Sequence, residues 1–593
     1  MISSTHTTTL ISLLAERAGA DPHKLIYSHL PDHPSRAPSD CTRGELLLRA
    51  ASIARRLGEI CEPGDRALII YPIGLEYLCA FFACLLARVV AVPVYPPRAH
   101  KRIPDSSLPR LRAIMRDCRP RIALSESETL ERMGQMRLPE SAGIEFIDTA
   151  RIEDDPGSLP WKDFPRPEQP AFLQYTSGST AMPRGVQITH ANLLHNQQVI
   201  RDNYGFHQEL RGLGWLPLYH DMGLIGHILQ PLFNGGCTYF MNPAAFLKNP
   251  LRWLEEITRY RATTAATPPF GLRLVIEAAR EADSLEQIDL SSWRHLLVGA
   301  EPIDARVLRE FSESFEAYGF SPSIYYPCYG LAEATLSVSG GKTTDSFRSF
   351  QARRDELAEM RWAAAGTDFI GASVELVASG AVHSDFDLRI VDPETRRPRA
   401  ADEIGEIWIA GASIASGYFD RAADNREVFG ARLAGDESSP AAPEYLRTGD
   451  LGIVHDGELF VTGRIKELLI VGGRNHHLPD IESNIRSMNF WADRTIAAFV
   501  VRGADTEELG IAIEWGRHAP EPEAVAGEVA AAIAGIARVF YLSVYDFVLL
   551  KAGSIPRTSS GKIQRGLCSR YYEQTWPGLV FYSSRAERGP IDE

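Results

Sequence analysis

The sequence lacks a long uninterrupted apolar run and shows no targeting segment at its start. Its longest apolar stretch, "LCAFFACLLARVVAVPVY", is broken by Arg88 and Pro93 before it reaches the roughly 20 residues that a spanning helix needs. The first residues carry neither a basic segment nor a cleavage-site pattern. The eight cysteines are scattered, without a Cys-x-x-Cys pair or metal-ligand spacing, as expected for reduced thiols. We therefore predict a cytoplasmic protein without integral membrane insertion.

An excess of positive charge is also missing. The chain has 62 lysines and arginines against 76 aspartates and glutamates, a net charge of −14. General nucleic-acid binding depends on neutralising phosphates, so this balance argues against a nucleic-acid partner, although it leaves room for a local basic pocket. What remains is an ordinary globular composition, 45% hydrophobic and 23% charged.

The length of 593 residues exceeds what one hydrophobic core supports, so at least two domains are expected. Residues 64–97 have the pattern strand, helix, strand, and similar alternation recurs further along the chain. This predicts an α/β fold with a large N-terminal region built on parallel and mixed sheets. Residues 370–464 look β-rich, and a small α+β domain with a helix near 523–540 is expected to end the chain. We place the domains at residues 1–465 and 466–593.

No Walker-type phosphate loop occurs, but a segment rich in hydroxyls and glycine follows a predicted strand. In "LQYTSGSTAMPRGVQITH" (173–190), Gly178 is not followed by the Gly-Lys-Ser/Thr of a Walker loop. Glycine lets backbone N–H groups approach an anion, hydroxyls add donors, and Arg184 adds a planar cation suited to phosphate oxygens. We interpret the segment as a loop between a strand and a helix that either binds phosphate or is a flexible surface linker.

A hairpin is predicted in "YLRTGDLGIVHDGELFVTGRIKELLI" (445–470). Asp456-Gly457 between alternating apolar residues is a strong signal for a two-residue turn. With that turn, Asp450 is expected opposite Gly463, at the same open end of the hairpin as Arg464. A carboxylate beside a guanidinium can hold the vicinal diol of a ribose; a surface ion pair next to a turn is the alternative.

A third segment, "SIPRTSSGKIQR" (554–565), places Lys562 on a hydroxyl-rich loop near the C-terminus. Such a loop can carry a mobile ammonium group to an anionic site. Exposed lysines are common, however, so this segment alone indicates little.

Together and in this order, these segments resemble the adenylate-forming superfamily of acyl-CoA synthetases, luciferases and peptide-synthetase adenylation domains. "YTSGSTAMPRGV" is similar to its phosphate loop, "YGLAEAT" to its adenine and magnesium motif, "RTGD" with "GRIKELLIVGGRN" to its ribose and hinge segment, and "PRTSSGKIQR" to its lysine loop. Within the superfamily, "AVPVYPPR", "WLPLYHDMGLIGHILQPL", "VGAEPI" and "GRNHHLPDIE" most resemble fatty acyl-AMP ligases. That branch carries an insertion after the adenine motif. The charged stretch at about Lys342–Ala372 lies at this position. By default a stretch of this composition would be a solvated loop, and its position is what gives it meaning.

The resemblance implies ATP-dependent formation of an acyl-adenylate, with ATP and Mg²⁺ as cofactors. It assigns the β- and γ-phosphates to Thr176, Ser177, Gly178, Ser179, Thr180 and Arg184, and Mg²⁺ to Glu333. It places Gly299, Ala300, Glu301, Tyr329 and Gly330 around the adenine, and Asp450 and Arg464 at the ribose. Lys562 would bridge the substrate carboxylate and the α-phosphate, and Lys466 would be the hinge of a mobile C-terminal domain. His220 would lie near the reacting carboxylate, or be merely structural.

The branch passes its acyl group to the phosphopantetheine arm of a carrier protein and rejects free coenzyme A. No carrier-type serine motif occurs in this chain. The resemblance therefore implies a fatty or related carboxylic acid as substrate and an acyl carrier protein of a polyketide or peptide synthase acting in trans. A fatty acyl-CoA synthetase and a catalytically silent nucleotide-binding protein remain as alternatives.

Two departures from the pattern stand out. Arg184 replaces the lysine usual in the wider superfamily, which keeps the charge. Residues 266–270, "ATPPF", replace the Gly-Gly-Pro-Asn-Phe that borders the acyl pocket in the branch. Losing two glycines and an asparagine predicts a narrowed or reshaped pocket, suited to a medium-chain, branched or unusual acid.

Overall fold

The computed structural model describes residues 9–584, apart from residues 34, 98–107, 137, 159–162, 177–182, 207–209, 342–345, 367, 437–438, 440, 472–473, 493, 503–506, 517–521, 559–561, 575 and 577–579. Helices and strands alternate through the first half of the chain, as the alternating pattern predicts. No helix in these ranges is both long enough and apolar enough to cross a membrane.

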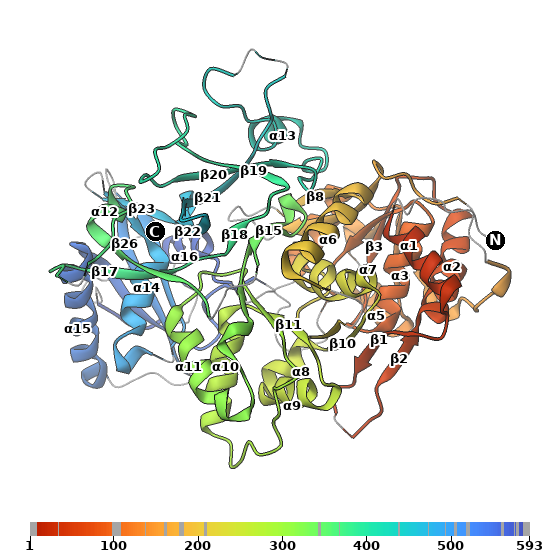
Figure 1. Ribbon diagram of the computed structural model, residues 1–593, viewed down its shortest axis with the longest axis horizontal. Coiled ribbons are helices and arrows are strands. Elements are labelled where there is room, and N and C mark those ends of the chain that lie inside the picture. The colour runs from red at the N-terminus through yellow and green to blue at the C-terminus, as the bar shows by residue number, and fades with distance from the viewer. Residues whose placement is uncertain are drawn as a thin grey trace.

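Two mixed sheets, mostly parallel, organise the N-terminal region (Figure 1). In both, one edge pair is antiparallel, β7–β8 in the first and β1–β2 in the second. The six-stranded sheet has the order β6-β5-β3-β4-β7-β8, with β3 (Arg66–Ile69), β4 (Val90–Pro93), β5 (Ile122–Ser125), β6 (Glu145–Asp148), β7 (Pro170–Thr176) and β8 (Arg184–Thr189). The seven-stranded sheet has the order β13-β12-β11-β9-β10-β1-β2, with β1 (Leu25–Leu30), β2 (Ser39–Thr42), β9 (Arg211–Gly214), β10 (Cys237–Met241), β11 (Thr264–Thr267), β12 (His295–Val298) and β13 (Tyr325–Pro327).

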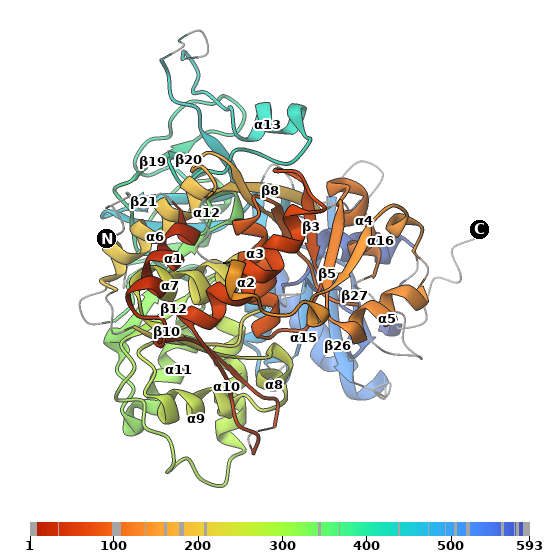
Figure 2. The same ribbon diagram turned by 90° about the vertical axis from the view of Figure 1, so that its right-hand side faces the viewer.

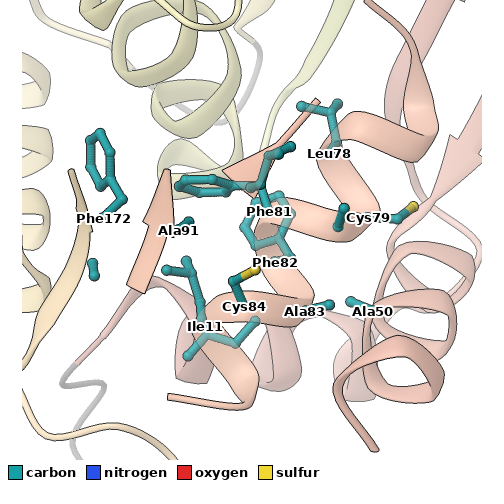
Figure 3. Packing of buried hydrophobic residues seen from close by; sticks show 14 of the residues in the cluster. Ile11, Ala50, Leu78, Cys79, Phe81, Phe82, Ala83, Cys84, Ala91 and Phe172 are labelled. Carbon is teal, nitrogen blue, oxygen red and sulfur yellow. The ribbon is translucent and has the colours of Figure 1, made fainter. Parts of the chain in front are cut away.

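The helices of this region cover the two sheets and fill the space between them. They are α1 (Leu10–Ala20), α2 (Arg43–Gly58), α3 (Leu75–Leu86), α4 (Leu108–Cys118), α5 (Ser127–Met136), α6 (His190–Tyr204), α7 (Gln230–Asn234), α8 (Pro243–Lys248), α9 (Leu251–Tyr260), α10 (Pro269–Arg280) and α11 (Ala305–Phe315). Helix α3 is apolar on all sides and is therefore buried. Its Phe81 meets Phe172 of β7 edge-on at 5.7 Å, in the core shown in Figure 3.

An antiparallel sheet follows, which confirms the predicted β-rich texture up to residue 464. Its order is β14-β15-β18-β22-β21-β20-β19, with β14 (Tyr329–Gly330), β15 (Ser337–Gly340), β18 (Ala381–Val382), β19 (Phe386–Val391), β20 (Gly405–Gly411), β21 (Leu446–His455) and β22 (Glu458–Arg464). Helix α13 (Ala422–Val428) precedes β21.

The stretch at the position of the insertion is folded where it is described, so the expectation of a solvated loop is wrong there. It contains β16 (Ser349–Arg353) and α12 (Arg354–Ala358), and β16 pairs with β17 (Ser373–Val377). The rings of Phe350 and Trp362 stack at 4.3 Å, and Trp362 is buried beneath the antiparallel sheet. Apolar burial outweighs the charged composition, and Arg354 pairs with Asp480 of the C-terminal part at 3.2 Å.

The C-terminal part, blue in Figures 1 and 2, is a small α+β unit with the predicted helix near 523–540. Its strands are β23 (Leu468–Val471), β24 (Arg474–His477), β25 (Ile496–Arg502), β26 (Glu507–Gly516), β27 (Val544–Lys551) and β28 (Val580–Ser583), and its helices are α14 (Leu478–Arg486), α15 (Pro522–Phe540) and α16 (Arg565–Glu573). In β25, Ile496 and Ala498 face one hydrophobic cluster while Ala497 and Phe499 face another, so the sheet is covered on both sides. The boundary at residues 465–466 stays a prediction.

Candidate active site

A cavity of about 400 Å³ lies where the three large sheets meet the C-terminal part. Side chains from strands, loops and a helix line it. Among the residues predicted from the sequence, its wall contains Thr176, Arg184, His220, Ala300, Tyr329, Gly330, Glu333, Arg464, Lys466 and Lys562. Segments hundreds of positions apart therefore border one pocket.

The phosphate-loop residues Ser177, Gly178, Ser179 and Thr180 lie outside the described residues. The strands that carry the loop are defined: Thr176 ends β7 and Arg184 begins β8, and the two residues are paired. The expectation that the loop leads directly into a helix is wrong. An antiparallel strand intervenes, and α6 begins only at His190, capped by a reciprocal Thr189–Asn192 box.

Asp450 and Arg464 form the predicted pair at the open end of the β21–β22 hairpin, but the register differs by one residue. The turn lies at Asp456-Gly457 as predicted, both with positive φ. Thr462 is an extra residue on β22, so Leu451 faces Gly463 and Asp450 faces Arg464 directly. The bulge therefore corrects the expected Asp450–Gly463 pairing and puts carboxylate and guanidinium on the same face.

Asp450 is buried, with 2% of its surface exposed, and its carboxylate has two partners. Its Oδ1 lies 2.5 Å from Arg464 Nε, and its Oδ2 accepts from the Tyr329 hydroxyl at 2.8 Å. The Asp450 charge raises the pKa of Arg464, and burial with Asp450 nearby raises the pKa of Tyr329. Arg464 keeps half of its side chain exposed. The Asp450 carboxylate is therefore held in one orientation, with the Arg464 guanidinium beside it.

Glu333 and Arg184 are joined through Tyr418, which sequence reasoning missed. The Tyr418 hydroxyl donates to Glu333 Oε1 at 2.8 Å, and the Arg184 guanidinium lies 4.4 Å from the centre of the Tyr418 ring. Tyr418 is held against β8 by a bridge to Val186. No sequence motif singles out this tyrosine, because its position depends on a contact between segments more than 200 residues apart.

The donors near Glu333 are suited to Mg²⁺, although they do not form a complete protein cage. Within the described residues, no group of three or more His, Cys, Asp or Glu side chains gathers as a metal site. Mg²⁺ commonly uses one or two carboxylates and takes its other ligands from water and substrate phosphates. Glu333 borders the same cavity as Thr176 and Arg184, so its carboxylate fits that role.

Replacing Tyr418 with phenylalanine is expected to raise the Mg²⁺ concentration needed for half-maximal activity about fivefold, as for the loss of one hydrogen bond worth about 1 kcal/mol. The ring beneath Arg184 remains, but Glu333 is no longer oriented. A Mg²⁺ titration of activity measures the change. Tyr445→Phe is the matched control, because that hydroxyl also donates to a carboxylate, Asp387, but away from the cavity. Equal Mg²⁺ dependence in both variants contradicts the assignment.

The segment predicted to border the adenine has two unusual backbone positions. A Cβ on Gly299 would lie 2.7 Å from the Cys328 carbonyl oxygen, so only glycine fits there. Ala300 follows with φ of 68°, a left-handed backbone conformation that is strained for any residue with a Cβ atom. Glu301 is not in the cavity wall. Burial raises its pKa, and the charges of Arg273 and Lys562 oppose that shift.

Lys562 reaches the cavity on its loop, between β27 and α16. The Thr558 backbone N–H donates to the Lys562 carbonyl at 2.7 Å, and the Lys562 N–H donates to Thr558 Oγ1 at 3.0 Å. Burial lowers the pKa of the ammonium and Arg464 lowers it further, while Asp221, Glu301 and Asp450 counteract them. Lys466 follows Arg464 in a short 3₁₀ helix (Ile465–Glu467), where β22 ends.

His220 also borders the cavity, and the structure adds a partner for it. Asp221 Oδ1 lies 2.6 Å from His220 Nδ1. The two residues stand before a π-helix (Met222–Leu229), a rare element that is frequent at functional sites. Asp221 was not among the predicted site residues, although an acid next to a histidine in "LYHDMG" was a visible signal.

One part of the remaining cavity wall is apolar. It includes Met222 and Gly226 of the π-helix, Ala265 and Ala266 of β11, and Leu297, with Phe206 and other side chains beyond them. Of residues 266–270, which differ from the pattern of the fatty acyl-AMP ligases, Ala266 is in the cavity wall. The cavity thus has a polar portion, suited to a nucleotide, and an apolar portion, suited to a hydrocarbon chain.

The fold and the cavity together are those of an adenylate-forming enzyme. The family model described as "AMP-binding enzyme" matches residues 15–419. The chain is 35% identical to the medium-chain fatty acid–acyl-carrier-protein ligase JamA of Moorena producens over 99% of both chains. It is 34% identical to the long-chain fatty acid–AMP ligase FadD26 of Mycobacterium tuberculosis, over 95% of this chain and 96% of that one.

Solved structures agree with these relatives. A crystal structure of the fatty acid AMP ligase from Legionella pneumophila superposes with a TM-score of 0.73 and 32% identity, covering 98% of this chain and 99% of that one. A structure from work on fatty acyl-adenylate ligases of E. coli and L. pneumophila reaches a TM-score of 0.83 with 31% identity, covering 96% and 99%. The chain belongs to the AMP-binding enzyme family, and its resemblance to fatty acyl-AMP ligases is confirmed.

Proposed function

We propose that this protein activates a fatty or related carboxylic acid with ATP and transfers the acyl group to the phosphopantetheine thiol of an acyl carrier protein. The observation that supports this best is one cavity whose wall brings together Lys562, Arg464, which is paired with Asp450, and apolar side chains. The relatives named as fatty acid–AMP and fatty acid–carrier ligases support the same reaction. We propose that it takes place in the cytoplasm.

In the first step, an oxygen of the substrate carboxylate attacks the α-phosphorus of ATP. The bond from that phosphorus to the bridging oxygen breaks, and pyrophosphate leaves with the electron pair. Negative charge builds on the α-phosphoryl oxygens, so fixed cations and hydrogen-bond donors stabilise the transition state. Lys562 borders the cavity from the C-terminal part, and we assign it the contact with both the carboxylate and the α-phosphate.

The other roles are those that the family resemblance implies, and Thr176, Arg184, Glu333 and Arg464 border the cavity. Thr176 and Arg184, with the loop Ser177–Thr180 between them, hold the β- and γ-phosphates. Glu333 holds Mg²⁺, which neutralises phosphate charge when bound. Asp450 accepts from the ribose diol, and Arg464 fixes that carboxylate. Gly299, Ala300, Glu301, Tyr329 and Gly330 border the adenine. The charge of Glu301 also raises the pKa of Lys562.

The apolar portion of the cavity takes the acyl chain. Two aromatic residues at the end of α6 and beyond it, Tyr204 and Phe206, limit its volume. Two carrier-protein ligases among the relatives, JamA and TtuA, are named for medium-chain acids. We propose a medium-chain acid, with Ala266 shaping the pocket next to the reacting group.

In the second step, the carrier thiolate attacks the acyl carbonyl carbon, the acyl–phosphate bond breaks, and AMP leaves. Lys562 is no longer needed in the cavity at that stage. We propose that residues 466–593 rotate about Lys466, in a domain that begins after residue 465. The carrier comes in trans.

The test is a product assay with purified protein, Mg²⁺, ATP and acids from short to long chain. Acyl-adenylate and pyrophosphate are expected to form, and acyl groups to appear on the phosphopantetheine of a carrier protein but not on coenzyme A. Amino acids and aromatic acids are the negative controls. Rapid acyl-CoA formation would make the protein an acyl-CoA synthetase, and ATP binding without pyrophosphate release would make it a silent nucleotide-binding protein.

A further inference from the structure

Asp221 is a charged residue in the cavity wall to which the reaction above gives no role. Its side chain is 13% exposed, and its Oδ1 accepts from the Met222 backbone N–H at 2.7 Å, at the start of the π-helix. The same oxygen lies 2.6 Å from His220 Nδ1. A carboxylate only accepts hydrogen bonds, so Nδ1 carries the proton that lies between the His220 ring and Asp221.

Asp221 also acts on Lys562, which comes from the C-terminal part. Burial opposes ionisation of Asp221, but His220 and Lys562 more than offset it and hold the pKa of this carboxyl below its ordinary value. Asp221 therefore stays charged at neutral pH. Both side chains border the same cavity, one from each part of the chain.

The charged groups that face Lys562 are Arg464, Asp221, Glu301 and Asp450. Asp450 is already paired with Arg464 at 2.5 Å. Glu301 is not in the cavity wall, and burial raises its pKa. Asp221 is thus the carboxylate whose charge is most available to the ammonium. Without such a charge, burial and the neighbouring guanidinium favour the neutral amine, which cannot bridge two anions.

We propose that Asp221 is a positioning residue that fixes the His220 ring and supplies the negative charge against which the Lys562 ammonium is seated when the two parts of the enzyme close. This inference rests on the proposed function and deepens it. The Asp221 carboxylate would thereby align His220 of the N-terminal region with Lys562 of the C-terminal part.

The experiment compares Asp221→Asn with the wild-type full-length chain. Acyl-adenylate formation is measured as a function of pH from about pH 6 to 10, which spans the histidine and lysine titrations. Lys562 is active as the ammonium, so activity falls as pH rises through its pKa. Removing the Asp221 charge lowers that pKa further, and the alkaline limb is expected to move about one unit to lower pH. The KM for ATP is expected to change little, and Asp221→Glu is expected to restore the limb.

Two further variants separate this effect from loss of structure. Asp221→Ser keeps an oxygen for the Met222 N–H and is expected to show the same shifted limb, even if the asparagine variant folds poorly. Asp148→Asn is the matched control, because Asp148 also accepts from a backbone N–H, that of Ala150, but lies outside the cavity wall. Its pH profile is expected to match the wild type.

An alkaline limb at the wild-type position in Asp221→Asn and Asp221→Ser overturns the inference, whatever the loss in rate. Failure of Asp221→Glu to restore the limb does the same. A wild-type enzyme that forms no acyl-adenylate refutes the proposed function instead, and this outcome is distinct because the inference fails only when the wild type is active.

Discussion

Replacing Lys562 with alanine is expected to slow acyl-adenylate formation by about 10²- to 10³-fold, the cost of removing one preorganised donor from a developing oxyanion. ATP binding is expected to survive, because the residues to which we assign the adenine, ribose and phosphate contacts precede the C-terminal part. The measurement pairs pyrophosphate release at saturating substrate with the binding affinity for ATP. Loss confined to the rate is the signature of a group that acts in the transition state.

Lys551→Ala is the control for that variant. Lys551 is an exposed lysine at the end of β27 in the same C-terminal part, and it is not in the cavity wall. Its removal is expected to leave the rate unchanged. An unaltered rate in Lys562→Ala would remove this lysine from the mechanism.

Replacing Asp450 with asparagine is expected to raise the KM for ATP roughly 10- to 100-fold, equivalent to about 1.5–3 kcal/mol for hydrogen bonds to a charged group. The amide keeps the size of the carboxylate, but its NH₂ group faces donors, the Tyr329 hydroxyl and Arg464 Nε. The ribose loses its acceptor and Arg464 loses its counter-charge. Steady-state kinetics with varied ATP, at saturating acid, measure the effect.

The same hairpin offers the control. Asp456→Asn changes an exposed aspartate at the turn, where asparagine before glycine is equally suited to positive φ. That variant is expected to keep the wild-type KM. If Asp450→Asn also keeps it, the carboxylate does not hold the ribose.

The regular parts of the fold were predictable because local pattern and burial agree. The apolar run of α3 between two short strands, and the alternation along β25, each reflect one dominant periodicity. Strand β8 was missed because "RGVQIT" is short and its pairing with β7 spans a loop. The helix signal at Thr189 and Asn192 was real but began after that strand.

The site was predictable to the extent that its residues belong to segments with recognisable chemistry. Thr176, Arg184, Tyr329, Glu333, Arg464 and Lys562 all border the cavity. The bulge at Thr462 could not be foreseen, because its position depends on packing across the whole antiparallel sheet. Tyr418 was missed for the same reason, since only a tertiary contact brings it to Glu333. Glu301, which is also predicted at the adenine, is not in the cavity wall.

The hairpin β21–β22 has the Asp450–Arg464 pair at one end and its turn, Asp456-Gly457, at the other. Asp450 and Arg464 are 14 positions apart along the chain, yet they face each other because the reversal lies at the far end of the ladder. The side chain of Asp456 at that reversal is 66% exposed. A fluorophore or a short peptide tag grafted there would sit away from the nucleotide and leave the strand register intact, which makes this tip an attachment point for tracking the enzyme while it turns over.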